Sequence, residues 1–230
     1  KNLIDALEKY VDPKNISLNC TNLEFEKIDG KGFKSNASDE LFSHVVSTAG
    51  SYQLAHLFPF ADPDKITTIN QLQYARVAQV SLGFKNWEGV PLKAFGGLVP
   101  FKENREILGI LFLSSFLKNK APKGGAQLSV FLGGVRKPEM VDLSDNEIIE
   151  IVKKEVTEML GLNSFEPDLL KISRYQHAIP QYGKESEAKL KAISEIEHAS
   201  PGLILAGNIR DGIGMADRIR QARKIATMIS

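Results

Sequence analysis

Residues 203–214 read Leu-Ile-Leu-Ala-Gly-Asn-Ile-Arg-Asp-Gly-Ile-Gly, and this stretch decides the fold. Its four leading apolar residues predict a short buried strand. Gly207, Gly212 and Gly214 then predict a turn that accepts positive φ angles and lets a ligand approach the backbone. Apolar residues recur at helical spacing after the turn and predict an amphipathic helix: Met215, Ile219, Ala222, Ala226 and Ile229. A strand, a glycine turn and a helix start place unpaired backbone N–H groups together, which suits an anion or an electron-rich ring.

The glycine spacing of this turn leaves its role open. It is not the dinucleotide-binding spacing G-x-G-x-x-G, and that fingerprint occurs nowhere else in the sequence. Strand–glycine–helix junctions also occur in α/β proteins that bind no ligand at that point. The turn is therefore a candidate cofactor site, with an ordinary structural junction as the alternative.

The composition is that of a globular protein without a strongly charged surface. The chain has 230 residues, of which 43% are hydrophobic and 25% charged, and its formal net charge is +1. This balance argues against nucleic-acid binding. The longest apolar run, near residues 107–113, is too short to cross a bilayer. The single cysteine, Cys20, excludes an internal disulfide and any site with several cysteine ligands, and it fits a reducing, cytoplasmic setting.

The sequence predicts neither a metal site nor a catalytic constellation of side chains. No two histidines have the spacing of a zinc site. No Ser–His–Asp arrangement and no nucleophile elbow can be recognised.

The two ends of the chain have α/β character. Segments with helical patterns cover residues 3–11, 49–58 and 184–198. Extended segments are expected over 16–20, 23–28 and 41–48, and a loop over 59–68 is the first plausible boundary.

The middle of the chain is rich in predicted strands, over 74–84, 94–100, 107–115, 127–132 and 168–178. Ser144 and Glu147 form a capping-box pattern that opens a helix, and Gly161 ends it. Its inward side chains are expected to be Ile148, Ile149, Val152, Val156 and Met159. This arrangement predicts one domain inserted into another.

Two strand segments of the middle part place an aromatic residue beside glycines. They are Phe95-Gly96-Gly97-Leu98-Val99 and Phe131-Leu132-Gly133-Gly134. Glycine weakens a strand and often marks a bulge or a close approach by a ligand. Together with Leu111 these segments could wall a flat, apolar pocket. An ordinary sheet core with bulges is the alternative.

Several segments, taken in order, resemble a known family. They are 94–100, 108–110, 131–134, 178–182 and 205–214. The chain resembles the oxygen-dependent protoporphyrinogen oxidases, flavoenzymes of late haem synthesis in the broader group of amine oxidases and phytoene desaturases. The last segment marks only the broad group. The segments Phe-Gly-x-Leu-Val-Pro and Ile-Pro-Gln-Tyr narrow the resemblance to the family.

The resemblance implies an α/β (α+β) fold in two parts. Residues 1–58 and 199–230 would form a partial, Rossmann-like FAD-binding domain. Residues 59–198 would form a substrate-binding domain with a mixed β-sheet and flanking helices. The family's glycine-rich pyrophosphate turn, its membrane-contacting helical region and its propionate-binding arginine have no counterpart here. We therefore expect this chain, which opens at Lys1, to be the C-terminal portion of a longer enzyme.

The resemblance also assigns roles to residues. Those matching the family's tetrapyrrole pocket are Phe95, Gly96, Leu98, Leu111 and Phe131. Those matching positions near FAD are Leu23, Tyr175, Gly207, Asn208, Gly212, Ile213, Gly214 and Met215. No catalytic side chain is implied, because the flavin carries the chemistry.

The implied activity is the oxidation of protoporphyrinogen IX or coproporphyrinogen III to the porphyrin, with FAD as cofactor and molecular oxygen as acceptor. This chain would carry half of the FAD site and would be inactive alone. A cytoplasmic location with peripheral contact to the inner face of the cell membrane, through the absent region, is expected, and a homodimer is an open alternative. Two other functions stay open: another flavin amine oxidase or phytoene desaturase-like enzyme, and a non-catalytic fragment that does not bind FAD alone.

Overall fold

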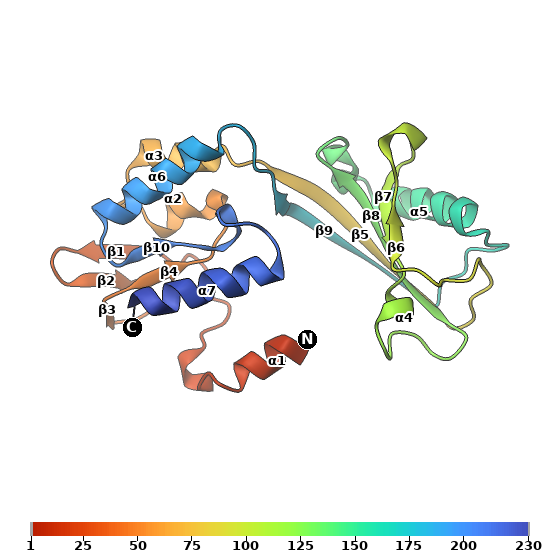
Figure 1. The fold of residues 1–230 in the computed structure, drawn as a ribbon, viewed down its shortest axis with the longest axis horizontal. Coiled ribbons are helices and arrows are strands. Elements are labelled where there is room, and N and C mark those ends of the chain that lie inside the picture. Colours follow the sequence, from red (N-terminus) through yellow and green to blue (C-terminus); the bar gives the residue numbers. More distant parts are fainter. Residues whose placement is uncertain (1, 230) are drawn as a thin grey trace. The chain divides into compact units, whose positions relative to one another are not determined.

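The computed structural model describes residues 2–229, and Lys1 and Ser230, the outer ends of the expected domains, lie outside this description. The chain divides into two compact units (Figure 1). Unit 1 comprises the two ends of the chain, up to Leu72 and from Tyr182 onward. Unit 2 comprises the continuous segment Gln73–Gln181. A central segment inserted between two terminal pieces is the organisation that the sequence predicts.

Unit 1 contains two small sheets and the helices of the chain ends. An antiparallel sheet has the order β1 (Phe25–Ile28), β2 (Gly32–Ser35), β3 (Leu41–Phe42). A two-stranded parallel sheet pairs β4 (Val45–Ser47) with β10 (Leu203–Leu205). The α-helices are α1 (Asn2–Glu8), α2 (Leu54–Leu57), α3 (Pro63–Asn70), α6 (Ser186–Ala199) and α7 (Met215–Ile229). Short 3-10 turns cover Pro13–Asn15, Ser51–Gln53 and Gly207–Ile209.

The parallel pair in unit 1 joins residues that are remote in sequence. Leu203 lies opposite Val45 and Leu205 opposite Ser47. Leu203 and Leu205 are buried, so the apolar run at 203–206 forms the buried strand that the sequence predicts. The end of β4 and the turn after β10 are thereby brought side by side.

Unit 2 is built on one five-stranded sheet with the order β6-β7-β8-β5-β9. The strands are β5 (Tyr74–Phe84), β6 (Gly96–Leu98), β7 (Ile107–Leu111), β8 (Ala126–Gly134) and β9 (Leu169–Pro180). The remaining elements are α4 (Leu113–Phe116), α5 (Asp145–Leu160) and 3-10 turns at Phe101–Glu103 and Pro138–Asp142. The α/β class is confirmed. Every pair in this sheet is antiparallel rather than mixed.

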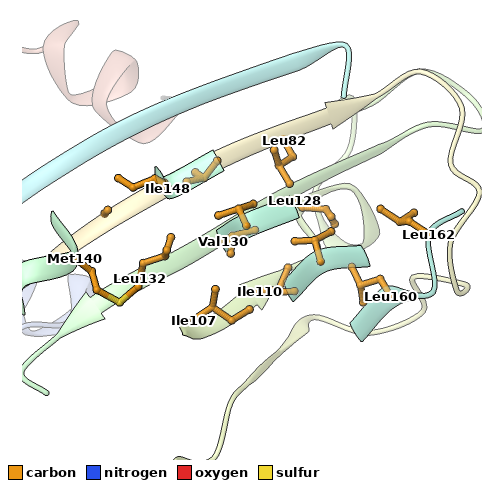
Figure 2. Close-up of a cluster of buried hydrophobic side chains, with 14 of the residues drawn as sticks. Leu82, Ile107, Ile110, Leu128, Val130, Leu132, Met140, Ile148, Leu160 and Leu162 are labelled. Carbon is orange, nitrogen blue, oxygen red and sulfur yellow. The ribbon is translucent and has the colours of Figure 1, made fainter. Parts of the chain in front are cut away.

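The core of unit 2 lies between α5 and one face of the sheet. Ile148, Val152 and Val156 on α5 are fully buried. They pack with the alternate residues of β5 and β8 that face them, including Leu82, Leu128, Val130 and Leu132 (Figure 2). The predicted capping box is present at Ser144 and Glu147, and Gly161 ends the helix in the left-handed conformation. Met159 is 37% exposed rather than inward, because Leu160 occupies the buried position at that end of the helix.

Some local expectations are corrected by the structure. Residues 16–20 form no strand, and 41–48 divides into β3 and β4, which belong to different sheets. Residues 107–115 contain β7 followed by the short helix α4. The expected loop at 59–68 contains most of α3, because Asp62 accepts N–H bonds from Asp64 and Lys65 and Pro63 begins the helix.

The helix α3 also affects where the units divide. It packs on α6, with Ile66 and Ile69 buried on one helix and Ile193 and Ile196 on the other. Residues 59–72 and 182–198 therefore belong to unit 1, whereas the expected boundaries placed them with the middle of the chain.

Candidate functional site

The turn after β10 has the backbone geometry that its glycines predict. Gly207 has a φ of 80° and Gly212 a φ of 91°. A Cβ atom on Gly207 would lie 2.8 Å from the carbonyl oxygen of Thr48, so this position accepts only glycine without a shift of the backbone. Asp211 also has a positive φ, of 60°. The turn therefore needs glycine at position 207, where its backbone lies directly against Thr48 after the end of β4.

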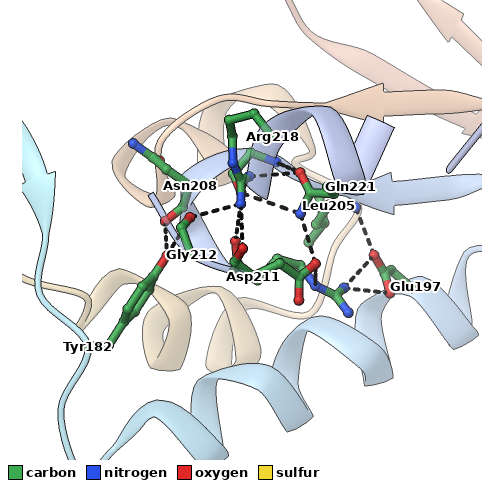
Figure 3. A network of polar contacts seen from close by, with 10 residues as sticks. Tyr182, Glu197, Leu205, Asn208, Asp211, Gly212, Arg218 and Gln221 are labelled. Carbon is green, nitrogen blue, oxygen red and sulfur yellow. Dashed lines mark hydrogen bonds and ion pairs between the residues drawn. The ribbon is translucent and has the colours of Figure 1, made fainter. Parts of the chain in front are cut away.

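One arginine holds this turn from inside. Arg218, near the start of α7, donates through Nη2 to the carbonyl oxygens of Arg210 (2.9 Å), Asp211 (3.0 Å) and Gly212 (2.8 Å). Its Nη1 donates to the carbonyl oxygen of Gly207 and, at 2.8 Å, to Oε1 of Gln221 (Figure 3). The turn is thus wrapped around a single guanidinium group.

Gln221 and Tyr182 complete the network. Gln221 is buried, and its Oε1 accepts the Gly207 N–H at 2.9 Å while its Nε2 donates to Oδ2 of Asp211 at 2.9 Å. The hydroxyl of Tyr182 donates to the carbonyl oxygens of Asn208 (2.7 Å) and Gly212 (3.1 Å) (Figure 3). The turn is therefore held by side chains from two other parts of unit 1.

A cavity of about 650 Å³ opens between this turn, the end of β4 and α7. Thr48, Gly207, Asn208 and Arg218 contribute polar groups to its wall. The other lining residues are mainly apolar: Val46, Ala206, Ile213, Ala222, Ile225, Ala226 and Ile229. This combination of an apolar wall with a few polar groups is typical of a site for a flat organic ligand.

The predicted FAD residues in unit 1 are divided between two neighbouring cavities and the hydrogen-bond network of Arg218. Gly207, Asn208 and Ile213 line the cavity. Gly212 lies in the Arg218 network. Leu23 lines a neighbouring cavity of about 380 Å³, which shares Val46 and Thr48 with the first.

The start of α7 is only partly as expected. The Gly214 N–H is not an unpaired donor, because it bonds to Oδ2 of Asp217 at 3.1 Å. Met215 is 68% exposed. The other apolar residues of the predicted stripe on α7, including Ile219 and Ile229, are also exposed. The apolar face of α7 is therefore not buried within unit 1.

The predicted substrate residues lie in unit 2, and most of them share one face of its sheet. The register pairs Gly96 with Leu111, Leu98 with Gly109, and Gly109 with Phe131. Directly opposed residues point to the same side of a sheet. These side chains alternate with the ones that pack on α5, so they lie on the opposite face. We call this side the Phe131 face, defined by Gly96, Leu98, Leu111, Phe131, Gln79, Ser129, Ser173 and Tyr175.

The Phe131 face carries polar as well as apolar side chains. Gln79 lies opposite both Phe131 and Ser173, and its Nε2 donates to Oγ of Ser129 at 2.9 Å. Tyr175 lies opposite Val77 on the same side of the sheet. Phe95 precedes β6 and stacks on Phe116 with ring centroids 4.1 Å apart.

The sequence reasoning missed several residues of the site. Arg218 and Gln221 were hidden in a charged helix pattern, where an arginine is usually read as solvated. Tyr182 stands in the Ile-Pro-Gln-Tyr segment, which was a usable signal. Thr48 follows a predicted strand and carries no motif.

The side chains form neither a metal-ligand cluster nor a bilayer-spanning helix within the described residues 2–229. Within residues 2–229, no three His, Cys, Asp or Glu side chains gather as ligands for a metal ion. None of the helices in this described part has both the length and the apolar content needed to cross a bilayer.

Comparison with known proteins identifies relatives. The sequence profile of the flavin containing amine oxidoreductase family matches residues 1–229. The chain is 28% identical to the mitochondrial protoporphyrinogen oxidase of Nicotiana tabacum over 96% of its own length and 46% of that enzyme. It is 27% identical to the coproporphyrinogen III oxidase of Bacillus subtilis (strain 168) over 69% of its length and 34% of that enzyme.

A solved structure shares the fold. It is named "Putative protoporphyrinogen oxidase from Exiguobacterium sp. 255-15", with a TM-score of 0.84 and 24% identity. The match covers 99% of this chain and 50% of that one. The chain therefore spans about half the length of the proteins that it matches or less.

Proposed function

This chain belongs to the family of flavin-containing amine oxidoreductases, and from that premise we propose that it is part of an FAD-dependent oxidase acting on a porphyrinogen. The substrate class would be protoporphyrinogen IX or coproporphyrinogen III, with molecular oxygen as the final acceptor. The observation that carries this proposal is the placement of Gly96, Leu98, Leu111 and Phe131 on a single sheet face. The names of the relatives support it.

The residues of unit 1 fit part of an FAD site. The turn at Gly207 leaves no room for a side chain, and the cavity beside it has an apolar wall with a cationic group at its edge. We assign Gly207, Asn208, Gly212, Ile213, Gly214 and Met215 to the flavin end, and Leu23 to the adenine end. Bound FAD would supply the acceptor for hydride removed from the substrate. The chain would contribute half of the site.

The Phe131 face of unit 2 fits a flat, largely apolar substrate. Phe131 and Leu111 would contact the macrocycle. The glycines at 96 and 109 let β6 and β7 lie close together, because a Cβ on either glycine would collide with a carbonyl oxygen of the other strand. Phe95, stacked on Phe116, would border the macrocycle, and Tyr175 matches a family position near the flavin. These residues would orient the substrate and exclude water, and none of them would need to exchange a proton.

Binding by the chain itself tests the proposal. In NMR titrations, FAD should shift the amide signals of residues 207–215, and protoporphyrin IX or coproporphyrin III should shift those of β7 and β8. Phe131→Ala should weaken porphyrin binding roughly tenfold, since an aromatic contact of this size is lost. Leu190→Ala is the control, because Leu190 is exposed and lies on α6 rather than on this sheet. Porphyrin binding that is equal in both variants would contradict the substrate face.

Activity is tested in a chimera. The chain should replace the matched half of the tobacco enzyme and support conversion of a porphyrinogen to a fluorescent porphyrin with consumption of oxygen. Assays with each porphyrinogen and with a primary amine separate the substrate classes. An aldehyde formed from the amine, without any porphyrin product, would favour an amine oxidase instead.

The other expectations rest on the family resemblance alone. They are a cytoplasmic location, peripheral contact with the inner face of the cell membrane and a homodimer. Each stays a prediction.

A further inference from the structure

Arg218 is surrounded by neutral oxygen atoms. Its hydrogen-bond acceptors are backbone carbonyls of the turn and the amide oxygen of Gln221. All four of these carbonyls belong to residues 207–212, so their oxygens are directed toward α7. Removing this one side chain would leave the whole turn without its common partner.

Arg218 forms no ion pair with a carboxylate within the described residues 2–229. Nearby arginines are paired, Arg210 with Glu197 at 3.2 Å and Arg220 with Asp217 at 3.0 Å. The carboxylate of Asp211 accepts from Gln221 and lies 3.4 Å from Nε of Arg210. Across residues 2–229, no carboxylate lies within 4.0 Å of the Arg218 guanidinium, and its Nε is buried without a hydrogen-bond partner.

This free charge lies at the candidate site. Arg218 and Gln221 both line the cavity that the turn closes on one side. A partly buried cation without a counter-ion favours the negatively charged form of whatever binds beside it. The carbonyl dipoles that point at the guanidinium lower its positive potential, but they leave its net positive charge in place.

We propose that Arg218, supported by Gln221, is the residue that positions the turn 207–212 and that gives the cavity its preference for an anionic ligand. The second part rests on the proposed function, because the flavin ring of FAD can gain a negative charge on reduction, whereas the diphosphate is anionic in both redox forms. Arg218 therefore has two roles. Its hydrogen bonds fix the shape of the turn, and its charge favours binding of an anionic ligand.

The positioning role is tested without any ligand. Amide hydrogen exchange over 207–212 should become roughly tenfold faster in Arg218→Met, because several hydrogen bonds are lost together. Gln221→Leu should accelerate exchange at Gly207, whose N–H loses its acceptor. Arg223→Met is the control, since Arg223 is an exposed arginine of the same helix. Exchange rates in Arg218→Met equal to those of the control would overturn this role.

The charge role is tested by comparing oxidised with reduced FAD. Under anaerobic conditions, NMR titration of the chain should give tighter binding for the reduced form. In Arg218→Met the ratio of the two affinities should fall roughly tenfold. Arg218→Lys should keep that ratio within about twofold, because it keeps the charge, yet it should loosen the turn, because it lacks the planar fork. If Arg218 had a structural role alone, the affinity ratio and the hydrogen-exchange rate of the turn would change together in Arg218→Lys.

The outcomes distinguish this proposal from the proposed function. An unchanged affinity ratio in Arg218→Met overturns the charge role. If neither form of FAD shifts any signal of the unaltered chain, the FAD assignment and the charge role both fail. Hydrogen exchange then still decides whether Arg218 positions the turn.

Discussion

Gly207 shows how one backbone position connects the turn to the strand beside it. Its φ of 80° lies in a region that residues with a side chain rarely adopt. The Thr48 backbone also occupies the space where a Cβ atom of residue 207 would lie. Its N–H and its carbonyl oxygen are both used, by Gln221 and Arg218. The residue is therefore fixed by conformation, space and hydrogen bonding at once.

Gly207→Ala is expected to destabilise the protein by roughly 1–3 kcal/mol, from backbone strain and the contact with Thr48. The measurement is the free energy of unfolding in urea. Gly97→Ala is the control, because a Cβ on Gly97 would meet no atom within 4 Å and the φ of this residue is not positive. Equal unfolding free energies for the two variants would show that the turn can shift without strain.

At this scale the sequence predicts the glycines but not their partners. The positive φ angles at Gly207 and Gly212 follow from residue type and are confirmed. That Arg218 binds their carbonyls depends on how α7 folds back along the turn, which helical spacing alone does not reveal. The Asp217 bond to Gly214 was missed for the same reason.

The helix α5 is the element whose sequence signals are most complete. Ser144 accepts the Glu147 N–H, and the Glu147 carboxylate accepts from the Ser144 N–H at 2.8 Å. Its buried stripe then covers one face of the sheet. By contrast, α3 was not predicted. Its first residues, Asp62-Pro63-Asp64, have the composition of a loop, and only the structure shows that Asp62 caps a helix there.

Ser144→Ala should lower the free energy of unfolding by about 1 kcal/mol, the usual effect of losing a serine N-cap. Lys154→Ala is a suitable comparison, because Lys154 is an exposed residue within the same helix. The two variants should differ in urea denaturation, and a similar midpoint for both would argue against a contribution from the cap.

Glu147 makes this cap sensitive to acid. Hydrogen bonds from the Ser144 side chain and backbone lower the pKa of Glu147 from its ordinary value of 4.5. A lowered folded-state pKa means that the stabilisation is present above 4.5 and disappears as the pH falls through the folded-state value. The stability difference between the natural chain and Glu147→Gln should therefore shrink on acidification below that value. A difference that stays constant from neutral to acidic pH would contradict this account.

Across the whole molecule, two separate cores support two units. Leu128 is fully buried in the core of unit 2 and Ile193 in that of unit 1. The inserted organisation was predictable from the change in pattern along the chain. The boundary residues were not, because the packing of α3 on α6 joins segments that are more than a hundred residues apart, and no local signal reports it.

Leu128→Ala should cost about 2–5 kcal/mol, as large-to-small changes in a packed core do. Hydrogen exchange should accelerate within 73–181 and much less in the other unit, while Ile193→Ala should give the reverse pattern. Acceleration spread evenly over both units by either change would mean that they unfold as one.

The first and last residues of unit 2 lie next to each other. The Gln181 N–H donates to the Gln73 carbonyl oxygen at 2.8 Å, so β5 begins where β9 finishes. A segment whose ends already meet can be exchanged for another of different length without opening the host around it. Evolution could in this way replace unit 2 while keeping unit 1 intact, and an engineer could graft a foreign sheet at the same junction.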